Sequence, residues 1–201
     1  MTTDFQNSSG AKINSSYILQ FSREWLKQPF RTGAITPSSK HLAHAITKGL
    51  TNKSGPILAL GAGTGVFTSA LIANGVLPQD ITAVEANGRF ADLLKEEFPT
   101  LGLTHGNAAR VHKLTNRTYG AAICGLPLLS MPNAVVLIIL KNSFTLLKPN
   151  AELRLFTYGW QCPVPRSIRT RLSLSTHRVA FVPLNIPPAS VYTLIQKDCA
   201  G

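Results

Sequence analysis

The chain has 201 residues, of which 44% are hydrophobic, 14% charged and 7% aromatic. This length and composition fit one globular domain with a buried core and exclude a disordered or fibrous protein. Three widely spaced cysteines indicate neither a disulfide framework nor a zinc site, so we expect no metal centre and a reducing, cytoplasmic compartment. The longest apolar run, 134–140, is too short to span a bilayer, and residues 1–10 lack the pattern of a secretory signal.

The charge is large and uneven. Twenty basic and nine acidic residues give a net charge of +11. The first hundred residues hold nine basic and seven acidic side chains, whereas the remainder holds eleven and two. Nucleic acid and an acidic lipid surface are the two partners that this asymmetry favours, and composition does not choose between them. A role in solubility alone also stays open.

The N-terminal region precedes the expected sheet. We expect residues 1–15 to be flexible, and Ser16–Phe30 to form an amphipathic helix with its apolar side at Tyr17, Phe21 and Trp25. Such a helix either packs on the protein core or lies in a membrane interface, where aromatic and basic side chains such as Trp25 and Lys27 are typical.

From Gly55 onward, short β-rich runs alternate with helical stretches, which predicts parallel strands joined by crossover helices. Strands are expected at 56–60, 81–85, 101–105, 119–124 and 152–158, followed by an antiparallel pair at 178–183 and 190–197. Helices are expected at 64–74, 88–98 and 133–147. This order predicts an α/β fold with a doubly wound, mainly parallel, seven-stranded sheet and a ligand at the carboxyl ends of the first strands.

The strongest motif is the glycine-rich run Gly61-Ala62-Gly63-Thr64-Gly65, which follows the first expected strand and opens a helix. Glycine lets the backbone turn sharply and approach a ligand closely, because no Cβ is in the way. Glu85 ends the next strand, 20 residues after Gly65, where a carboxylate can accept hydrogen bonds from both hydroxyls of a ribose.

The spacing of the glycines separates two classes of cofactor. A dinucleotide site needs a third glycine three residues after the second, where this chain has Val66. The pattern instead resembles the first two motifs of class I methyltransferases, whose cofactor is S-adenosylmethionine. The resemblance implies that the cofactor contacts Gly61, Ala62, Gly63, Thr64, Gly65, Glu85, Ala86, Asn107, Ala108, Cys124 and Gly125.

The loop after the fourth expected strand, Cys124 to Pro132, occupies the position of an Asn/Asp-Pro-Pro-aromatic motif in methyltransferases that modify base amines. Neither the polar side chain nor the aromatic ring of that motif is present here. Leu126 and Pro127 instead offer main-chain carbonyls and an apolar wall, which suit a small amine on a lipid better than a flat base.

A narrower resemblance rests on several segments together. The segments that carry this resemblance are Phe21, Trp25, Pro29-Phe30, residues 31–39, the glycine loop, Val84-Glu85-Ala86-Asn87 and Gly125-Leu126-Pro127-Leu128-Leu129. In them the chain resembles the bacterial phospholipid N-methyltransferases, which are similar to ribosomal RNA adenine dimethyltransferases. The resemblance implies methylation of phosphatidylethanolamine and its methylated intermediates towards phosphatidylcholine. It also implies one Rossmann-like domain over 16–201, with a helical lid and membrane-binding segment at 16–50 and a core at 55–201.

The resemblance further implies roles for individual residues. Leu126, Pro127, Tyr17 and Tyr158 are expected around the reacting amine, with Tyr17, Tyr158 and His105 as candidate proton acceptors by location. Contacts to lipid or membrane are expected from Phe21, Trp25, Lys27, Arg31, Arg166, Arg169 and Arg171. The expected location is the inner face of a bacterial cell membrane, with a phospholipid and no nucleic acid as partner.

Two departures from the family pattern keep alternatives open. The family usually has a glutamate where this chain has Ala59, and an aspartate where it has Asn107. Two missing carboxylates should weaken the binding of a cationic cofactor, because each charge-assisted hydrogen bond contributes roughly 1.5 to 3 kcal/mol. One alternative is therefore a membrane-binding homologue with weak or no catalysis. The other is a ribosomal RNA adenine N-methyltransferase, which the charge and the related fold favour.

Overall fold

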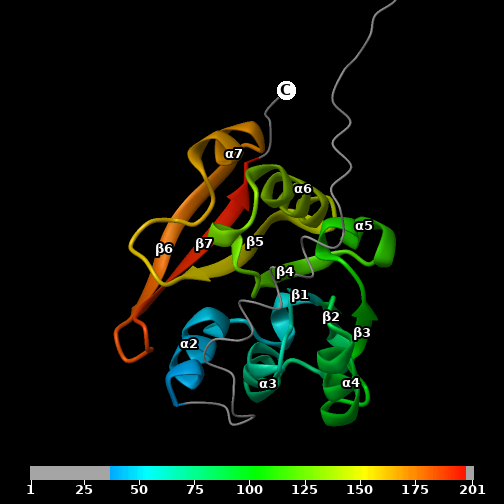
Figure 1. Ribbon diagram of the computed structural model, residues 1–201. Helices are drawn as coiled ribbons and strands as arrows, with labels where there is room; N and C mark the ends of the chain where they lie inside the picture. The colour runs from blue at the N-terminus through cyan, green and yellow to red at the C-terminus, as the bar shows by residue number, and fades with distance from the viewer. Residues whose placement is uncertain (1–36, 198–201) are drawn as a thin grey trace, which may run out of the picture.

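The computed structural model describes residues 37–197, which form a seven-stranded sheet (Figure 1). Its spatial order is β3-β2-β1-β4-β5-β7-β6, and β7 runs antiparallel to both of its neighbours. The strands are β1 (Ile57–Leu60), β2 (Ile81–Glu85), β3 (Gly102–His105), β4 (Tyr119–Cys124), β5 (Leu147–Thr157), β6 (Leu174–Val182) and β7 (Ala189–Gln196). The predicted doubly wound, mainly parallel sheet is thereby confirmed.

Helices cover both faces of the sheet, which gives three layers (Figure 1). One face carries α2 (Pro37–Thr47), α3 (Val66–Ala73) and α4 (Gly88–Glu97); the other carries α5 (Val111–Leu114), α6 (Asn133–Phe144) and α7 (Arg166–Arg171). Single 3-10 turns complete the chain at η1 (Asn52–Ser54), η2 (Pro78–Asp80), η3 (Ala108–Arg110) and η4 (Leu128–Ser130). None of the helices within 37–197 is long and apolar enough to cross a bilayer.

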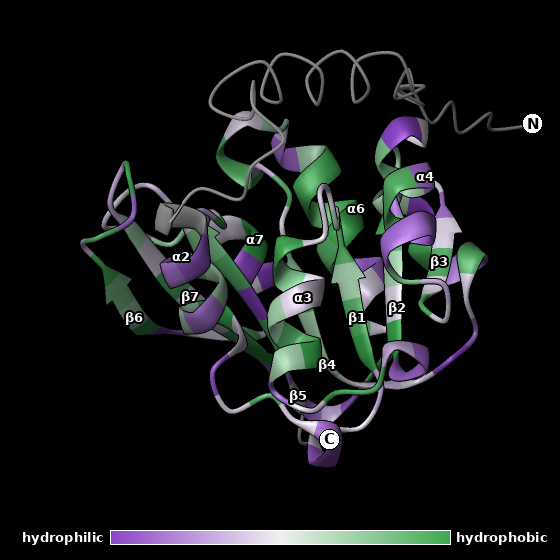
Figure 2. Ribbon diagram, turned by 90° about the horizontal axis from the view of Figure 1, so that it is seen from below, coloured by the Kyte–Doolittle hydropathy of each residue, from purple (hydrophilic) through white to green (hydrophobic). Residues whose placement is uncertain are grey.

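The two cores meet at the central strand β1. All four of its residues are buried, with Leu58 and Leu60 on the α6 side and Ile57 and Ala59 on the α3 side. A parallel strand covered on both faces is apolar throughout, which is why the run 57–60 could be recognised in the sequence. Figure 2 shows the hydrophobic β1 inside and the hydrophilic outer surface of α4.

The direction of the strands defines one functional edge. The parallel strands β1, β2, β3, β4, β5 and also β6 all end at the same edge of the sheet, which we call the carboxyl edge. The turn 183–188 between β6 and β7 lies at this edge too, because Val182 pairs with Ala189 and Ser190 pairs with Thr157 at the end of β5.

Several boundaries differ from the predicted ones. Helix α6 ends at Phe144 rather than at 147. Strand β5 begins at Leu147, which pairs with Tyr119 before a bulge interrupts the ladder. Asn150 adopts a left-handed conformation, with φ of 60°, just after the predicted end of helix α6. The last hairpin is longer than predicted and α7 was not predicted, while α2 lies within the segment 16–50 that was expected to be helical. The expected features of residues 1–36 lie outside the described residues.

Gly120 gives a direct test of the packing at the start of β4. A Cβ at this position would lie 1.8 Å from the Ser54 carbonyl oxygen, which is main chain and cannot move aside cheaply. We therefore expect Gly120→Ala to lower the free energy of unfolding by about 3 kcal/mol or more. Gly49→Ala is the control, since a Cβ there meets nothing within 4 Å and only its φ of 79° is strained. Its cost should be near 1 kcal/mol. Equal losses in urea unfolding would contradict this packing.

Candidate functional site

The glycine loop connects β1 to α3 at the carboxyl edge. Gly61, Gly63 and Gly65 all have positive φ angles, of 67°, 56° and 80°, which L side chains rarely adopt. The Gly61 N–H donates to the Val84 carbonyl at 2.8 Å, so the loop stays attached to β2 as it turns. A Cβ on Gly63 would meet nothing within 4 Å, which leaves open space beside the backbone at the centre of the loop.

Glu85 ends β2 and is 8% exposed. Its Oε2 accepts a hydrogen bond from the Gly63 N–H at 2.8 Å, and its Oε1 accepts one from the Asn87 N–H at 2.8 Å. The carboxylate is therefore held against the glycine loop, as the spacing of 20 residues predicts. Each oxygen keeps a further acceptor site, so the carboxylate can also receive hydrogen bonds from two neighbouring hydroxyls.

The end of β3 lies beside Glu85 in the parallel ladder, where Glu85 pairs with His105. Asn107 caps η3, because its Oδ1 accepts a hydrogen bond from the Ala109 N–H at 2.9 Å. Ala108 is buried in the core. The His105 ring lies 3.1 Å from the Ala86 carbonyl oxygen through Nε2, on the β2–β3 side of the edge, away from the loop after β4.

The loop after β4 crosses directly over the glycine loop. The Gly125 N–H donates to the Leu60 carbonyl at 2.8 Å, and the Leu126 side chain covers Gly61, where a Cβ would lie 2.5 Å from Leu126 Cδ2. The carbonyls of Leu126 and Pro127, expected to be open to an amine, already accept main-chain hydrogen bonds at 2.9 Å from Leu128 and Ser130 within the turn. Each keeps one lone pair for a ligand.

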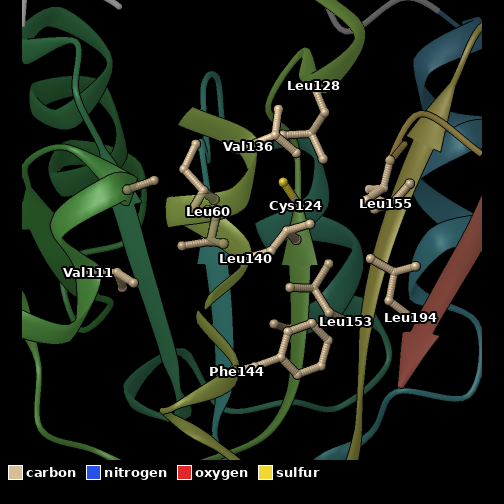
Figure 3. Close-up of a cluster of buried hydrophobic side chains, with 14 of the residues drawn as sticks. Leu60, Val111, Cys124, Leu128, Val136, Leu140, Phe144, Leu153, Leu155 and Leu194 are labelled. Atoms are coloured by element: carbon tan, nitrogen blue, oxygen red, sulfur yellow. The ribbon is translucent and has the colours of Figure 1, made fainter. Parts of the chain in front are cut away.

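The Cys124 thiol is not available for the expected contact with a cofactor. Its thiol is fully buried in the apolar cluster under α6, as Figure 3 shows, so it does not face a cofactor at the carboxyl edge. Burial raises its pKa to about 12, although a main-chain hydrogen bond from Leu126 opposes the shift. A thiol in this state is inert, and only the main chain of Cys124 remains available to a ligand.

The sequence was compared with protein families and with individual proteins. No family model matches the chain. Two uncharacterized Schizosaccharomyces pombe proteins, one described as a methyltransferase and one as methyltransferase-like, are 33% and 31% identical over 104 and 106 residues, which is 52% and 53% of this chain. The chain spans only 39% of the length of either relative.

Solved structures match nearly the whole chain. A magnesium protoporphyrin IX methyltransferase from Synechocystis has a TM-score of 0.67 at 10% identity, covering 94% of this chain and 100% of that one. A TehB-like methyltransferase from Corynebacterium glutamicum has a TM-score of 0.60 at 14% identity, covering 92% and 100%. This chain has the class I methyltransferase fold. Identities this low establish the fold alone.

An aromatic row at this methyltransferase-fold site was missed in the sequence. Phe67 on α3 packs edge-on against Phe156 on β5, with ring centroids 5.8 Å apart, and Phe156 packs edge-on against Tyr158 at 5.5 Å. Phe67 Cε2 lies 3.5 Å from the Cβ position of Gly125, so the row leads from the glycine loop to Tyr158. The alternation of Phe156 and Tyr158 was the available signal, since residues two apart on a strand share a face.

Of the two tyrosines expected around the reacting amine, Tyr158 lies within the described residues and Tyr17 lies outside them. It is 42% exposed, and partial burial of its hydroxyl raises the pKa of the phenol above its ordinary value of 10. The phenol is therefore protonated at neutral pH. This protonation state favours Tyr158 as a hydrogen-bond donor or as an aromatic surface over its expected role as a proton acceptor.

The arginine cluster of α7 lies far from the glycine loop in the methyltransferase fold. Gln196 donates to the Leu172 carbonyl at 3.0 Å, which fixes the end of α7 at the amino end of β6, opposite the carboxyl edge. Arg169 uses its Nε to donate to the Val164 carbonyl. The structure therefore does not bring Arg166, Arg169 and Arg171 to the site. Their expected contact with a membrane stays a prediction, as do those of Phe21, Trp25, Lys27 and Arg31, which lie outside the described residues.

Proposed function

We propose that this chain transfers a methyl group from S-adenosylmethionine to the amino group of a phosphatidylethanolamine-type phospholipid. The observation that carries the cofactor is the Glu85 carboxylate, which hydrogen bonds to the Gly63 N–H at the carboxyl edge. Solved structures with this fold include complexes with S-adenosylmethionine and S-adenosylhomocysteine, which supports the same cofactor here. The cofactor supplies an activated methyl group on a sulfonium.

The residues of the site fit this cofactor part by part. Glu85 accepts from the ribose hydroxyls, and the open space beside Gly63 admits the cofactor against the backbone. The Asn107 amide, with its oxygen on the Ala109 N–H, still has its NH₂ group to donate to a purine edge. Ala59 is buried among apolar side chains, so this chain has no carboxylate for an ammonium group at that position.

The loop after β4 indicates which class of molecule accepts the methyl group. Leu126 and Pro127 are half-buried, and Leu129 is 67% exposed, so the loop presents an apolar surface without an aromatic platform for a base. A lipid amine with its acyl chains suits such a surface better than RNA does. A Haemonchus contortus phosphoethanolamine N-methyltransferase matches 98% of this chain with a TM-score of 0.65 at 12% identity, which is an analogy of fold only.

The proton of the amine sets the pH dependence. An amine with a pKa of about 10.4 is mostly protonated at pH 7, and only its neutral form has the lone pair that attacks the methyl group. Because the Tyr158 phenol is itself protonated, the apolar loop favours the neutral amine by desolvation instead. The methylated ammonium product then gains a cation–π contact from the Tyr158 ring.

Substitution of Tyr158 separates its ring from its hydroxyl. We expect Tyr158→Phe to keep the rate of lipid methylation within about threefold and to leave its rise with pH unchanged. Tyr158→Ala should lose about fivefold to tenfold, because it removes a cation–π contact of about 1 kcal/mol with the positive charge that develops on the nitrogen during the transfer. Initial rates across pH 6 to 10 test this. A flattened pH profile in Tyr158→Phe would instead assign proton transfer to the phenol.

The acceptor itself is tested with labelled S-adenosylmethionine. The chain is incubated with vesicles of phosphatidylethanolamine and phosphatidylglycerol or with structured ribosomal RNA, and the products are separated. We expect label in mono- and dimethylated lipid and none in RNA. Label in adenine would establish the RNA methyltransferase instead. No label in either, with the cofactor still bound, would indicate a homologue that has lost catalysis.

A further inference from the structure

A group of exposed apolar side chains lies outside the site, on the loop after β5 and on the β6–β7 hairpin. Trp160 is 67% exposed, and Leu184 and Ile186 in the turn 183–188 are 66% and 81% exposed. Val179 and Phe181 on β6 add further apolar surface. We call Trp160, Phe181, Leu184 and Ile186 the hairpin surface. Large aliphatic side chains this exposed have no part in the core.

The Trp160 side chain is held in its exposed position. Its ring stacks on Phe181 with centroids 4.6 Å apart and planes 22° apart, and the Arg178 guanidinium lies 5.4 Å from the ring centroid. The Trp160 carbonyl accepts a hydrogen bond from the Tyr192 hydroxyl, which anchors the main chain. An exposed tryptophan beside an arginine is the combination found at membrane interfaces.

The hairpin surface is on the same side of the molecule as the site. The turn 183–188 follows the carboxyl end of β6, at the edge where the glycine loop leaves β1. Figure 1 shows this turn, in orange, projecting from the body of the molecule at the lower left. A flat surface that contacts the turn therefore approaches the carboxyl edge rather than the opposite one.

The charge of this region selects among possible partners. Between Glu152 and Asp198 the sequence has no acidic residue. Arg178 on β6 is exposed and lies against Trp160, so it gives the hairpin surface a positive charge. The bulge between Arg178 and Ala180 interrupts β6, the edge strand that would have to pair with a second copy of this chain. An anionic bilayer has the complementary charge and accepts apolar side chains at its interface.

We propose that the hairpin surface docks on an anionic lipid bilayer, with Leu184, Ile186 and the Trp160 ring in the interface and Arg178 at the headgroups. The identity of the partner rests on the proposed lipid substrate. Docking here turns the carboxyl edge towards the membrane from which the substrate comes. It is independent of the expected N-terminal helix.

The test is co-sedimentation of the full chain with vesicles of phosphatidylcholine and phosphatidylglycerol in equal amounts. We expect Leu184→Ser/Ile186→Ser to weaken binding about tenfold, because it removes two apolar side chains from the interface. Leu77→Ser/Leu93→Ser is the matched control, since both leucines are 50% exposed but lie away from the hairpin. Leu77 immediately precedes η2, and Leu93 is in α4. The control should bind within twofold of the original chain.

Fluorescence adds a readout at the surface itself. In a Trp25→Phe background, Trp160 is the one remaining tryptophan of the sequence, and its emission should shift to the blue on addition of the same vesicles. Unchanged vesicle affinity of Leu184→Ser/Ile186→Ser, or an unmoved Trp160 emission, overturns the proposal. Conversion of a dimer to a monomer by that variant, with vesicle affinity unaltered, would instead assign the surface to a second copy. Vesicle binding is measured without the methyl donor, so a failed methylation assay leaves this result intact.

Discussion

Glu85→Ala is expected to weaken the binding of S-adenosylmethionine about a hundredfold or more. The substitution removes the acceptor for two ribose hydroxyls, and each such charge-assisted bond contributes roughly 1.5 to 3 kcal/mol. It also leaves the Gly63 N–H without its 2.8 Å partner, so the glycine loop loses its tie to β2 at its centre. Isothermal titration calorimetry with S-adenosylhomocysteine measures the change in Kd.

Two further variants isolate the cause of this loss. Glu85→Gln keeps the shape and one acceptor oxygen, so its loss should lie between the alanine variant and the original chain. Glu97→Ala removes the same charge from the exposed end of α4 and should leave Kd unchanged within twofold. An affinity of Glu85→Ala equal to that of Glu97→Ala would place the cofactor elsewhere.

Gly125→Ala is expected to damage stability and cofactor binding together. A Cβ on Gly125 would lie 2.6 Å from the Gly61 carbonyl oxygen and 3.5 Å from that of Leu60, both of them main chain. Either the glycine loop or the loop after β4 must move, which we expect to cost about 2 to 3 kcal/mol of unfolding free energy. Because the displaced segment is the one that binds the cofactor, Kd should rise about tenfold as well.

Gly75→Ala serves as the control for Gly125→Ala. Gly75 follows α3, away from the site. Its φ is 87°, but a Cβ there would meet nothing within 4 Å. It should cost about 1 kcal/mol and leave Kd unchanged. Urea unfolding with and without S-adenosylhomocysteine measures both quantities. A Gly125→Ala chain with the original Kd would show that the two loops do not depend on each other.

The sheet could be predicted because its central strands are buried on both faces. The run Ile57–Leu60 is apolar throughout, and Ile81–Glu85 is rich in small and β-branched residues up to its last position, so both stand out from the helices between them. The approach of Glu85 to the glycine loop followed from the spacing alone, because adjacent parallel strands end at the same edge. The expected class of fold and the position of this pair therefore came from local pattern.

The features of the site that the sequence did not predict depend on where distant segments of the chain meet in the fold. Arg166, Arg169 and Arg171 form a dense cluster in the chain, but which edge of the sheet they reach depends on where the loop after β5 returns. In the aromatic row, local alternation could indicate the pair Phe156 and Tyr158, but not the contact of Phe156 with Phe67, which lies 89 positions earlier in the chain. The internal hydrogen bonds of Leu126 and Pro127 likewise follow from a turn that the sequence presents only as an apolar loop.

Calorimetric titration of the unaltered chain with S-adenosylhomocysteine, beside a parallel titration with NAD, tests the central claim most directly. The Glu85 carboxylate is held against the glycine loop, and this loop lacks the third glycine that a pyrophosphate requires. We therefore expect one saturable site for S-adenosylhomocysteine and no heat of binding with NAD. Saturable binding of NAD, or no binding of S-adenosylhomocysteine at millimolar concentration, would contradict the account.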